Sequence, residues 1–135
     1  MSATGSCNCG GVKYVIEGKM RSVTACHCTQ CQKQTGLYYA ATNVLDADLT
    51  VEDSGSLKWY LASDTAKRGF CGECGSALFW KRNGSDTTSI LAGSLDGDAG
   101  VKIERHIFAA DKGAFYDIED GLPQFPQSDG QTLVR

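Results

Sequence analysis

Three thiols and one imidazole lie within six residues in the segment CHCTQC, Cys26–Cys31. Four further cysteines occur in two shorter motifs, with Cys7 and Cys9 in SCNCGG and Cys71 and Cys74 in FCGECG. Cysteine thiolates act as nucleophiles and as metal ligands, so this grouping indicates disulfide bonding, redox chemistry or metal binding. The way in which the cysteines divide into groups distinguishes these possibilities.

Metal binding is the interpretation that uses all the cysteines. The total of seven is odd, so a set of disulfides would leave at least one thiol unpaired. An iron–sulfur cluster in a four-cysteine site would leave the other three thiols unexplained. Zinc is favoured over both alternatives, because short cysteine spacings allow one local turn to supply two ligands of a tetrahedron.

The two outer motifs together supply four thiols. A C-x-x-C followed by glycine, as in FCGECG, is typical of a zinc knuckle, and SCNCGG is a second two-thiol turn rich in glycine. We therefore expect Cys7, Cys9, Cys71 and Cys74 to form a closed structural zinc site. A site with four protein ligands has no position left for a substrate.

The middle motif supplies three ligands, Cys26, Cys28 and Cys31, and so predicts an open, catalytic zinc. His27 stands between two of them, and chelation by three consecutive residues would strain the backbone. We expect His27 to be a hydrogen-bond donor behind the ligands or a polar surface residue. His106 lies in the alternating segment VKIERHIF and is expected on one face of a strand.

The length indicates one zinc-bound domain over residues 1–135, with an irregular tail at its end. The formal net charge is −3, and no run of like charges favours a nucleic-acid or membrane partner. The start of the chain lacks the pattern of a signal peptide. We therefore expect a cytoplasmic protein, in a compartment where clustered cysteines bind metals more often than they form disulfides.

Short segments rich in β-branched and aromatic residues predict a mainly β fold. The expected strands lie in VKYVIEG, YYAATNVL, LKWYLA, SALFWK, TSILAGSL and VKIERHIF. A helical turn is expected between Thr24 and Thr35, through the three-cysteine motif. The tail PQFPQSDGQTLVR contains both prolines of the chain and is expected to be irregular.

The order of motifs GSCNCGG, CHCTQCQKQTG, FCGECGSALFW and AGSLD resembles the glutathione-dependent formaldehyde-activating (Gfa-like) family, from about Gly5 to Phe125. The resemblance implies a β-tent of small antiparallel sheets, held by a structural four-cysteine zinc, with a short helical turn at the second zinc site. It also implies two Zn²⁺ per chain, one structural and one catalytic, on the two sets of cysteines named above. Gln32 stands where family members often carry a basic residue, and Lys33 follows it. The segment GAFYDIEDGLPQF lacks a tryptophan that many members have.

The activity implied by the resemblance is that of a carbon–sulfur lyase, similar to S-(hydroxymethyl)glutathione synthase. Its partner would be a small-molecule thiol such as glutathione, bound as thiolate at the open zinc. His27, Tyr38 and Tyr39 are candidate proton donors, and Lys33, Arg68 and Arg105 are candidate partners for the carboxylates of glutathione. Two alternatives stay open: a carrier that binds the thiol adduct without accelerating its formation, and a structural zinc module.

Overall fold

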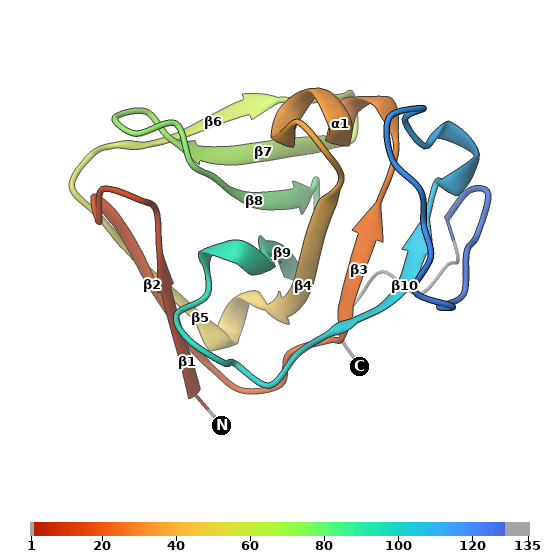
Figure 1. Ribbon diagram of the computed structural model, residues 1–135. Helices are drawn as coiled ribbons and strands as arrows, with labels where there is room; N and C mark the ends of the chain where they lie inside the picture. The colour runs from red at the N-terminus through yellow and green to blue at the C-terminus, as the bar shows by residue number, and fades with distance from the viewer. Residues whose placement is uncertain (1, 129–135) are drawn as a thin grey trace.

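The computed structural model describes residues 2–128 and consists mainly of β-strands (Figure 1). The strands are β1 (Ser2–Ser6), β2 (Val12–Glu17), β3 (Val23–Cys26), β4 (Tyr39–Leu45), β5 (Leu49–Asp53), β6 (Leu57–Leu61), β7 (Ala66–Cys71), β8 (Ala77–Arg82), β9 (Thr87–Leu91) and β10 (Ile103–Ile107). The described helices are α1 (Thr29–Thr35) and three short 3-10 helices, η1 (Asp46–Asp48), η2 (Ala92–Ser94) and η3 (Ala109–Asp111). The predicted mainly β fold is confirmed. Within residues 2–128, no helix is both long and apolar enough to cross a membrane.

The strands are arranged in two sheets. The smaller has the order β1-β2-β5, and the larger has the order β10-β3-β4-β9-β8-β7-β6. Neighbouring strands are antiparallel except for β10 and β3, which are parallel. Figure 1 shows that the larger sheet is strongly bent, so that β6, β7 and β8 run across the direction of β3 and β4, with α1 beside both groups. This bend gives the larger sheet a concave side.

The main hydrophobic core fills the space between β2 and the larger sheet. Side chains of β2 alternate between buried and exposed, which places Val12, Tyr14 and Ile16 on the inner side. They pack against buried side chains of β4, β8 and β9, namely Val44, Leu78, Phe79 and Ile90. Burying this apolar area supplies most of the free energy that favours the fold.

The larger sheet presents a different set of side chains on its other face. Phe79 of β8 lies opposite Ile90 of β9, and both side chains belong to the core. One residue further on, Trp80 lies opposite Ser89 in β9 and opposite Arg68 in β7. Because successive side chains point to opposite faces, this second row lies on the side away from the core. It is the row that lines the candidate site described below.

The expected helical turn between Thr24 and Thr35 is only partly correct. Residues up to Cys26 belong to β3, which pairs with both β4 and β10, and the helix begins at Thr29. The β-branched residues at the start of this segment favour the strand. The helix ends at Gly36, which has φ 86° and whose N–H bonds to the carbonyl of Gln32.

The predicted strands all occur, and the structure adds β1, β3, β5 and β7, which the sequence pattern did not indicate. Two of these, SATGS and AKRGFC, contain glycine and few β-branched residues. The tail is irregular in its described part, where the backbone of His106 exchanges hydrogen bonds with Pro123 and Phe125 at 2.9 Å each. Residues 129–135 of the expected irregular tail lie outside the described residues.

Gly5 provides a test of how β1 packs. A Cβ at this position would lie 2.2 Å from the ring end of Tyr14 and 2.5 Å from the carbonyl oxygen of Ser94. The Tyr14 ring is buried and its hydroxyl pairs with Ser94 Oγ at 2.6 Å, so it has little freedom to move. We expect Gly5→Ala to lower the free energy of unfolding by about 1–3 kcal/mol, measured by denaturant unfolding.

Gly93 is the matched control. Gly93 directly precedes Ser94, the partner of Tyr14. A Cβ at Gly93 would meet nothing within 4 Å, and the φ of Gly93 is not in the left-handed region. Gly93→Ala should leave the unfolding free energy unchanged within about 1 kcal/mol. Equal effects of the two substitutions would contradict the packing described for Gly5.

Candidate functional site

Four cysteines from two distant turns meet at one edge of the molecule. Cys7 and Cys9 lie in the turn from β1 to β2, and Cys71 and Cys74 lie in the turn from β7 to β8. All four sulfur atoms lie within 4.8 Å of one another. The Sγ atoms of Cys7 and Cys9 are 3.6 Å apart, and those of Cys9 and Cys71 are 3.7 Å apart. The structure thus brings together the set that the sequence predicted as a closed site.

Both turns close in the same way. Gly10 (φ 79°) and Gly75 (φ 80°) have left-handed backbones that a side chain would disfavour. Their N–H groups bond to the carbonyls of Cys7 at 3.2 Å and Cys71 at 2.8 Å. These bonds turn the chain tightly enough for the two thiols of each motif to point the same way. A hydrogen bond from the Ser76 hydroxyl lowers the pKa of Cys74 to about 5, which favours its thiolate.

The three remaining cysteines form the second cluster. Cys26 ends β3, Cys28 is the N-cap of α1 and Cys31 lies in the first turn of the helix. Their sulfur atoms also lie within 4.8 Å of one another. The backbone N–H of Cys31 donates to Cys28 Sγ at 3.3 Å, so the cap interaction of the helix also orients a thiol. Hydrogen bonds from the Cys26 and Cys31 thiols hold the pKa of Cys28 well below its usual range.

Arg68 of β7 is the cationic neighbour of this cluster. Its side chain is 3% exposed, with Nη2 donating to Cys31 Sγ at 3.4 Å and Nε donating to Gln30 Oε1 at 3.1 Å. The guanidinium lies over the ring of Tyr39, 4.9 Å from its centroid. Burial acts to lower the pKa of Arg68, but its interactions with Cys31 raise it, so the guanidinium stays charged.

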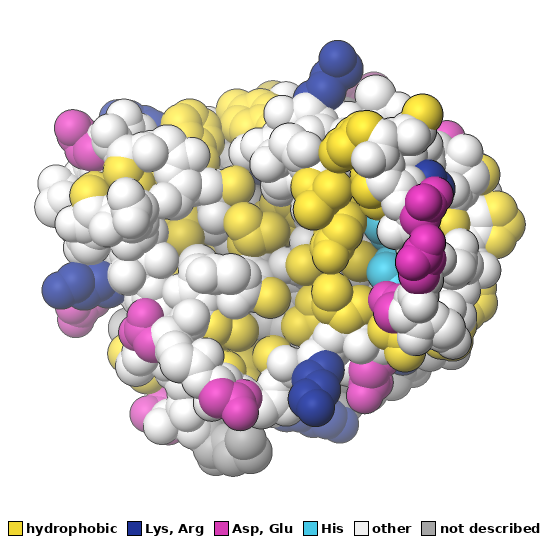
Figure 2. Space-filling view, in the orientation of Figure 1, with side chains coloured by type: hydrophobic (Ala, Val, Ile, Leu, Met, Phe, Trp, Pro, Cys, Tyr) yellow, Lys and Arg dark blue, Asp and Glu magenta, His cyan; other side chains and the backbone are white. Residues whose placement is uncertain are grey.

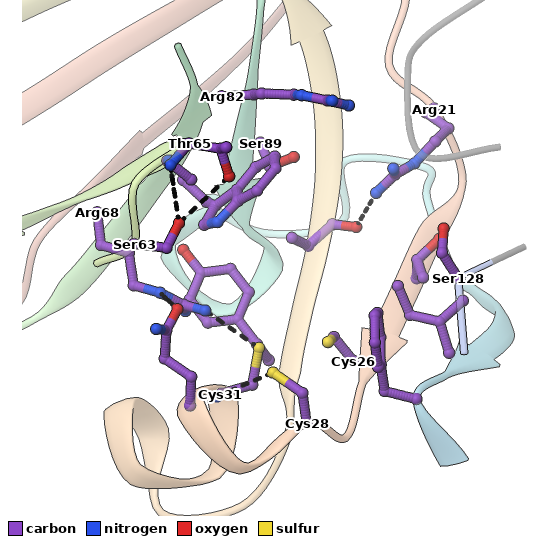
Figure 3. A pocket seen from close by; sticks show the side chains of 18 residues that line it. Arg21, Cys26, Cys28, Cys31, Ser63, Thr65, Arg68, Arg82, Ser89 and Ser128 are labelled. Carbon is purple, nitrogen blue, oxygen red and sulfur yellow. Dashed lines mark hydrogen bonds between the residues drawn. The ribbon is translucent and has the colours of Figure 1, made fainter. Parts of the chain in front are cut away.

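A cavity of about 350 Å³ opens next to the three sulfur atoms. The second row of the larger sheet supplies its wall, including Tyr39, Arg68, Trp80 and Ser89. In Figure 3, the sulfur atoms of Cys28 and Cys31 lie at one end of the cavity, beside Arg68, and Arg21 and Arg82 lie at the other end. The hydroxyls of Tyr39 and Thr24 also line it, buried and without a hydrogen-bond partner among the described residues. Unpaired buried donors at a cavity are available to a ligand.

His27 points away from this cavity. Its two ring nitrogens pair with Tyr116 OH at 2.6 Å and with His106 Nδ1 at 2.8 Å, and His106 Nε2 pairs with Asp120 at 2.7 Å. Burial and the neighbouring His106 lower the pKa of His27 to about 4, so the ring is neutral at pH 7. When both imidazole rings are neutral and His106 donates to Asp120, the hydrogen bonds run in one direction: Tyr116 donates to His27, and His27 donates to His106.

The two expectations for His27 are thus resolved in favour of a buried hydrogen-bonding role behind the ligands. His106 lies on a strand as predicted, but its pairing with His27 was not anticipated. On the face drawn in Figure 2, the histidine side chains show only as a small area beside acidic side chains, next to β10. Basic side chains are scattered over that face and form no single patch.

Of the other candidates, Tyr39 lines the cavity, while the ring of Tyr38 packs at a tilt against His27, with ring centroids 4.9 Å apart. Lys33 is exposed on α1 and is not among the residues that line the cavity. Gln32 has a structural role, since its amide donates to the carbonyls of His27 at 2.8 Å and Asp111 at 2.7 Å. Gln32 therefore links α1 by a hydrogen bond to η3, the segment that follows β10.

Both thiol sets fit a metal ion of the zinc type. In a tetrahedral site with Zn–S bonds of about 2.3 Å, sulfur atoms lie roughly 3.8 Å apart. The separations of 3.6 Å and 3.7 Å in the first cluster are close to this value. Thiolate donors suit zinc and other soft or borderline metals. Four ligands would close the first site, whereas three would leave one position of the second site for a ligand in the adjoining cavity.

Comparison with known proteins gives an independent assignment. The family model described as glutathione-dependent formaldehyde-activating enzyme matches residues 2–111, which include all the cysteines. A crystal structure of a Rhodobacter sphaeroides protein, a structural-genomics target, is similar with a TM-score of 0.59 and 25% sequence identity, over 74% of this chain and 98% of that one. No curated protein gives a significant match. The resemblance inferred from the motifs is confirmed, and this chain belongs to the glutathione-dependent formaldehyde-activating enzyme family.

Proposed function

We propose that the protein is a zinc-dependent carbon–sulfur lyase, similar to S-(hydroxymethyl)glutathione synthase, that acts on glutathione or another small thiol. Cys7, Cys9, Cys71 and Cys74 would hold the structural zinc. Cys26, Cys28 and Cys31 would hold the catalytic one. The observation that carries this proposal is that three converging thiols border a cavity with room for a fourth donor.

The reaction joins a thiol to formaldehyde. The sulfur forms a bond to the carbonyl carbon, the carbon–oxygen double bond becomes single, and the thiol proton ends on the new hydroxyl, without net oxidation. Zinc bound to the three thiolates would supply a Lewis acid that favours the thiolate form of the substrate.

The residues of the chain supply binding and proton transfer. Of the three proton donors suggested by the sequence, Tyr39 is the one that lines the cavity. Burial raises the pKa of Tyr39, so its hydroxyl is protonated and able to donate to a developing alkoxide. Arg68 donates to Cys31 and so offsets negative charge that accumulates on the thiolates.

The second candidate function is that of a carrier, which binds the thiol adduct without accelerating its formation. The same cavity would hold the adduct in that case. The structural module is less well supported, since a purely structural role needs no cavity beside the three-cysteine cluster. We further propose a cytoplasmic location and a single domain. The cytoplasmic location agrees with cysteines that are all free thiols in the structure.

Single cysteine variants test the two roles, with zinc content and melting temperature as the measurements. Cys71→Ser removes a ligand from a site that links turns 62 residues apart, so we expect a large loss of melting temperature and solubility. Cys28→Ser breaks a cluster confined to six residues, so the fold should persist with about one zinc instead of about two. Equal destabilisation by both variants would contradict the division into structural and catalytic sites.

Binding of glutathione should release about one proton per site near neutral pH, because the thiol becomes a thiolate. Calorimetry in buffers of different ionisation enthalpy measures this proton. Cys28→Ser is the control and should bind at least about tenfold more weakly. Equal affinity of the variant would mean that the substrate sulfur binds elsewhere.

Exchange NMR with labelled formaldehyde and glutathione separates the lyase from the carrier. Substoichiometric protein should accelerate both formation and breakdown of the adduct without changing its equilibrium amount. Tyr39→Phe should reduce the acceleration by about 10²-fold or more while two zinc ions per chain are retained. An unchanged exchange rate with wild-type protein, together with bound adduct, would favour the carrier.

A further inference from the structure

Arg68 has one nitrogen without a partner although the side chain is 97% buried, as its 3% exposure shows. Nε and Nη2 are both used, with Gln30 and Cys31, but Nη1 has no hydrogen-bond partner among the described residues. A buried charged donor left unpaired is costly. Such a group is available to an acceptor, and Arg68 lines the cavity in which a ligand would lie.

The position of this guanidinium is fixed with respect to the three-cysteine cluster. Nη2 lies 3.4 Å from Cys31 Sγ, and the guanidinium of Arg68 lies over the ring of Tyr39. Nη1 shares the same rigid fork, so any acceptor that it binds lies close to the open position of the cluster. Figure 3 shows Arg68 beside the cysteine sulfurs.

The charge around the cavity favours an anion. Three arginines line it, Arg21, Arg68 and Arg82, and its described lining residues include no aspartate or glutamate. Arg21 donates to the carbonyls of Ser22 at 2.9 Å and Ala41 at 2.6 Å, so it is held in place. Arg82 is exposed and lies with Arg21 at the end away from the cysteines (Figure 3). Positive charge is therefore present at both ends of the cavity.

We propose that Arg68 Nη1 binds the glycine carboxylate of glutathione while the substrate sulfur lies at the three-cysteine cluster, an inference that rests on the proposed function. Glutathione has two carboxylates, and that of glycine is separated from the sulfur by fewer bonds. It is therefore the one suited to a guanidinium beside Cys31. The γ-glutamyl carboxylate then extends toward Arg82 and Arg21. Arg68 is thus a residue that determines specificity for anionic thiols.

The test compares glutathione with its glycine ethyl ester, in which only the glycine carboxylate is blocked, on zinc-loaded protein by calorimetry. Wild-type protein should bind the ester about 10- to 100-fold more weakly than glutathione, because the ester lacks one charge-assisted hydrogen-bonding group. Arg68→Met should bind the two compounds equally, because the partner of the carboxylate is gone. Arg82→Met should still discriminate between them.

Lys33→Met is the matched control, since it removes a cation of α1 that does not line the cavity. It should discriminate as the wild type does. Zinc content and melting temperature are measured for each variant. If Arg68→Met does not fold, Arg68→Lys should discriminate less than wild type, because lysine lacks the fork of donors.

The outcomes separate this inference from the proposed function. Equal binding of glutathione and ester by wild-type protein would overturn the carboxylate site and leave the thiol site intact. Undiminished discrimination by the Arg68 variants would also overturn the role of Arg68. If neither compound binds to zinc-loaded wild-type protein, the proposed function is wrong and this inference is wrong with it.

Discussion

The alternation of side chains across the larger sheet is the constraint on which both the core and the candidate site depend. Phe79 and Ile90 face β2 and exclude water, while their neighbours Trp80 and Ser89 face the cavity. A shift of one residue in the pairing of β8 with β9 would exchange these two sets. The stability of the core therefore also fixes the position of the residues around Cys26, Cys28 and Cys31, although none of these three cysteines belongs to the main hydrophobic core.

The two cysteine clusters differ in what they join. The first lies where the turn of the smaller sheet meets the turn between β7 and β8, so it connects the two sheets. The second lies within one continuous segment, whose Cys26 ends β3 and whose Cys31 contacts Arg68 of β7. Local ligands can rearrange around a substrate without moving a distant strand. This difference is consistent with one cluster that holds the fold together and one that faces a ligand.

The sequence predicted the parts of the molecule that depend on local spacing. The division of the cysteines and the strands with clear alternation, such as β2, follow from residues close together in the chain. β7 was not indicated, because AKRGFC contains a glycine and two cations; it is a strand through its pairing with β6 and β8. The pairing of His27 with His106 joins residues 79 positions apart, and only the parallel contact of β3 with β10 brings them together. The sequence alone made Arg68 a candidate partner for a carboxylate of glutathione. Only the folded chain shows that its Nη1 atom has no hydrogen-bond partner among the described residues.

The chain of hydrogen bonds through the two histidines has a consequence for where this domain ends. The similarity to the family covers residues 2–111, yet the outer partners of the buried imidazoles, Tyr116 and Asp120, come after that limit. A polypeptide stopped at residue 111 would keep all seven cysteines and every strand described above. It would leave the buried ring of His27 without its partner Tyr116 and that of His106 without its partner Asp120. The hydrogen bonding of the two buried histidines therefore depends on residues that lie beyond the part of the chain that the family model matches.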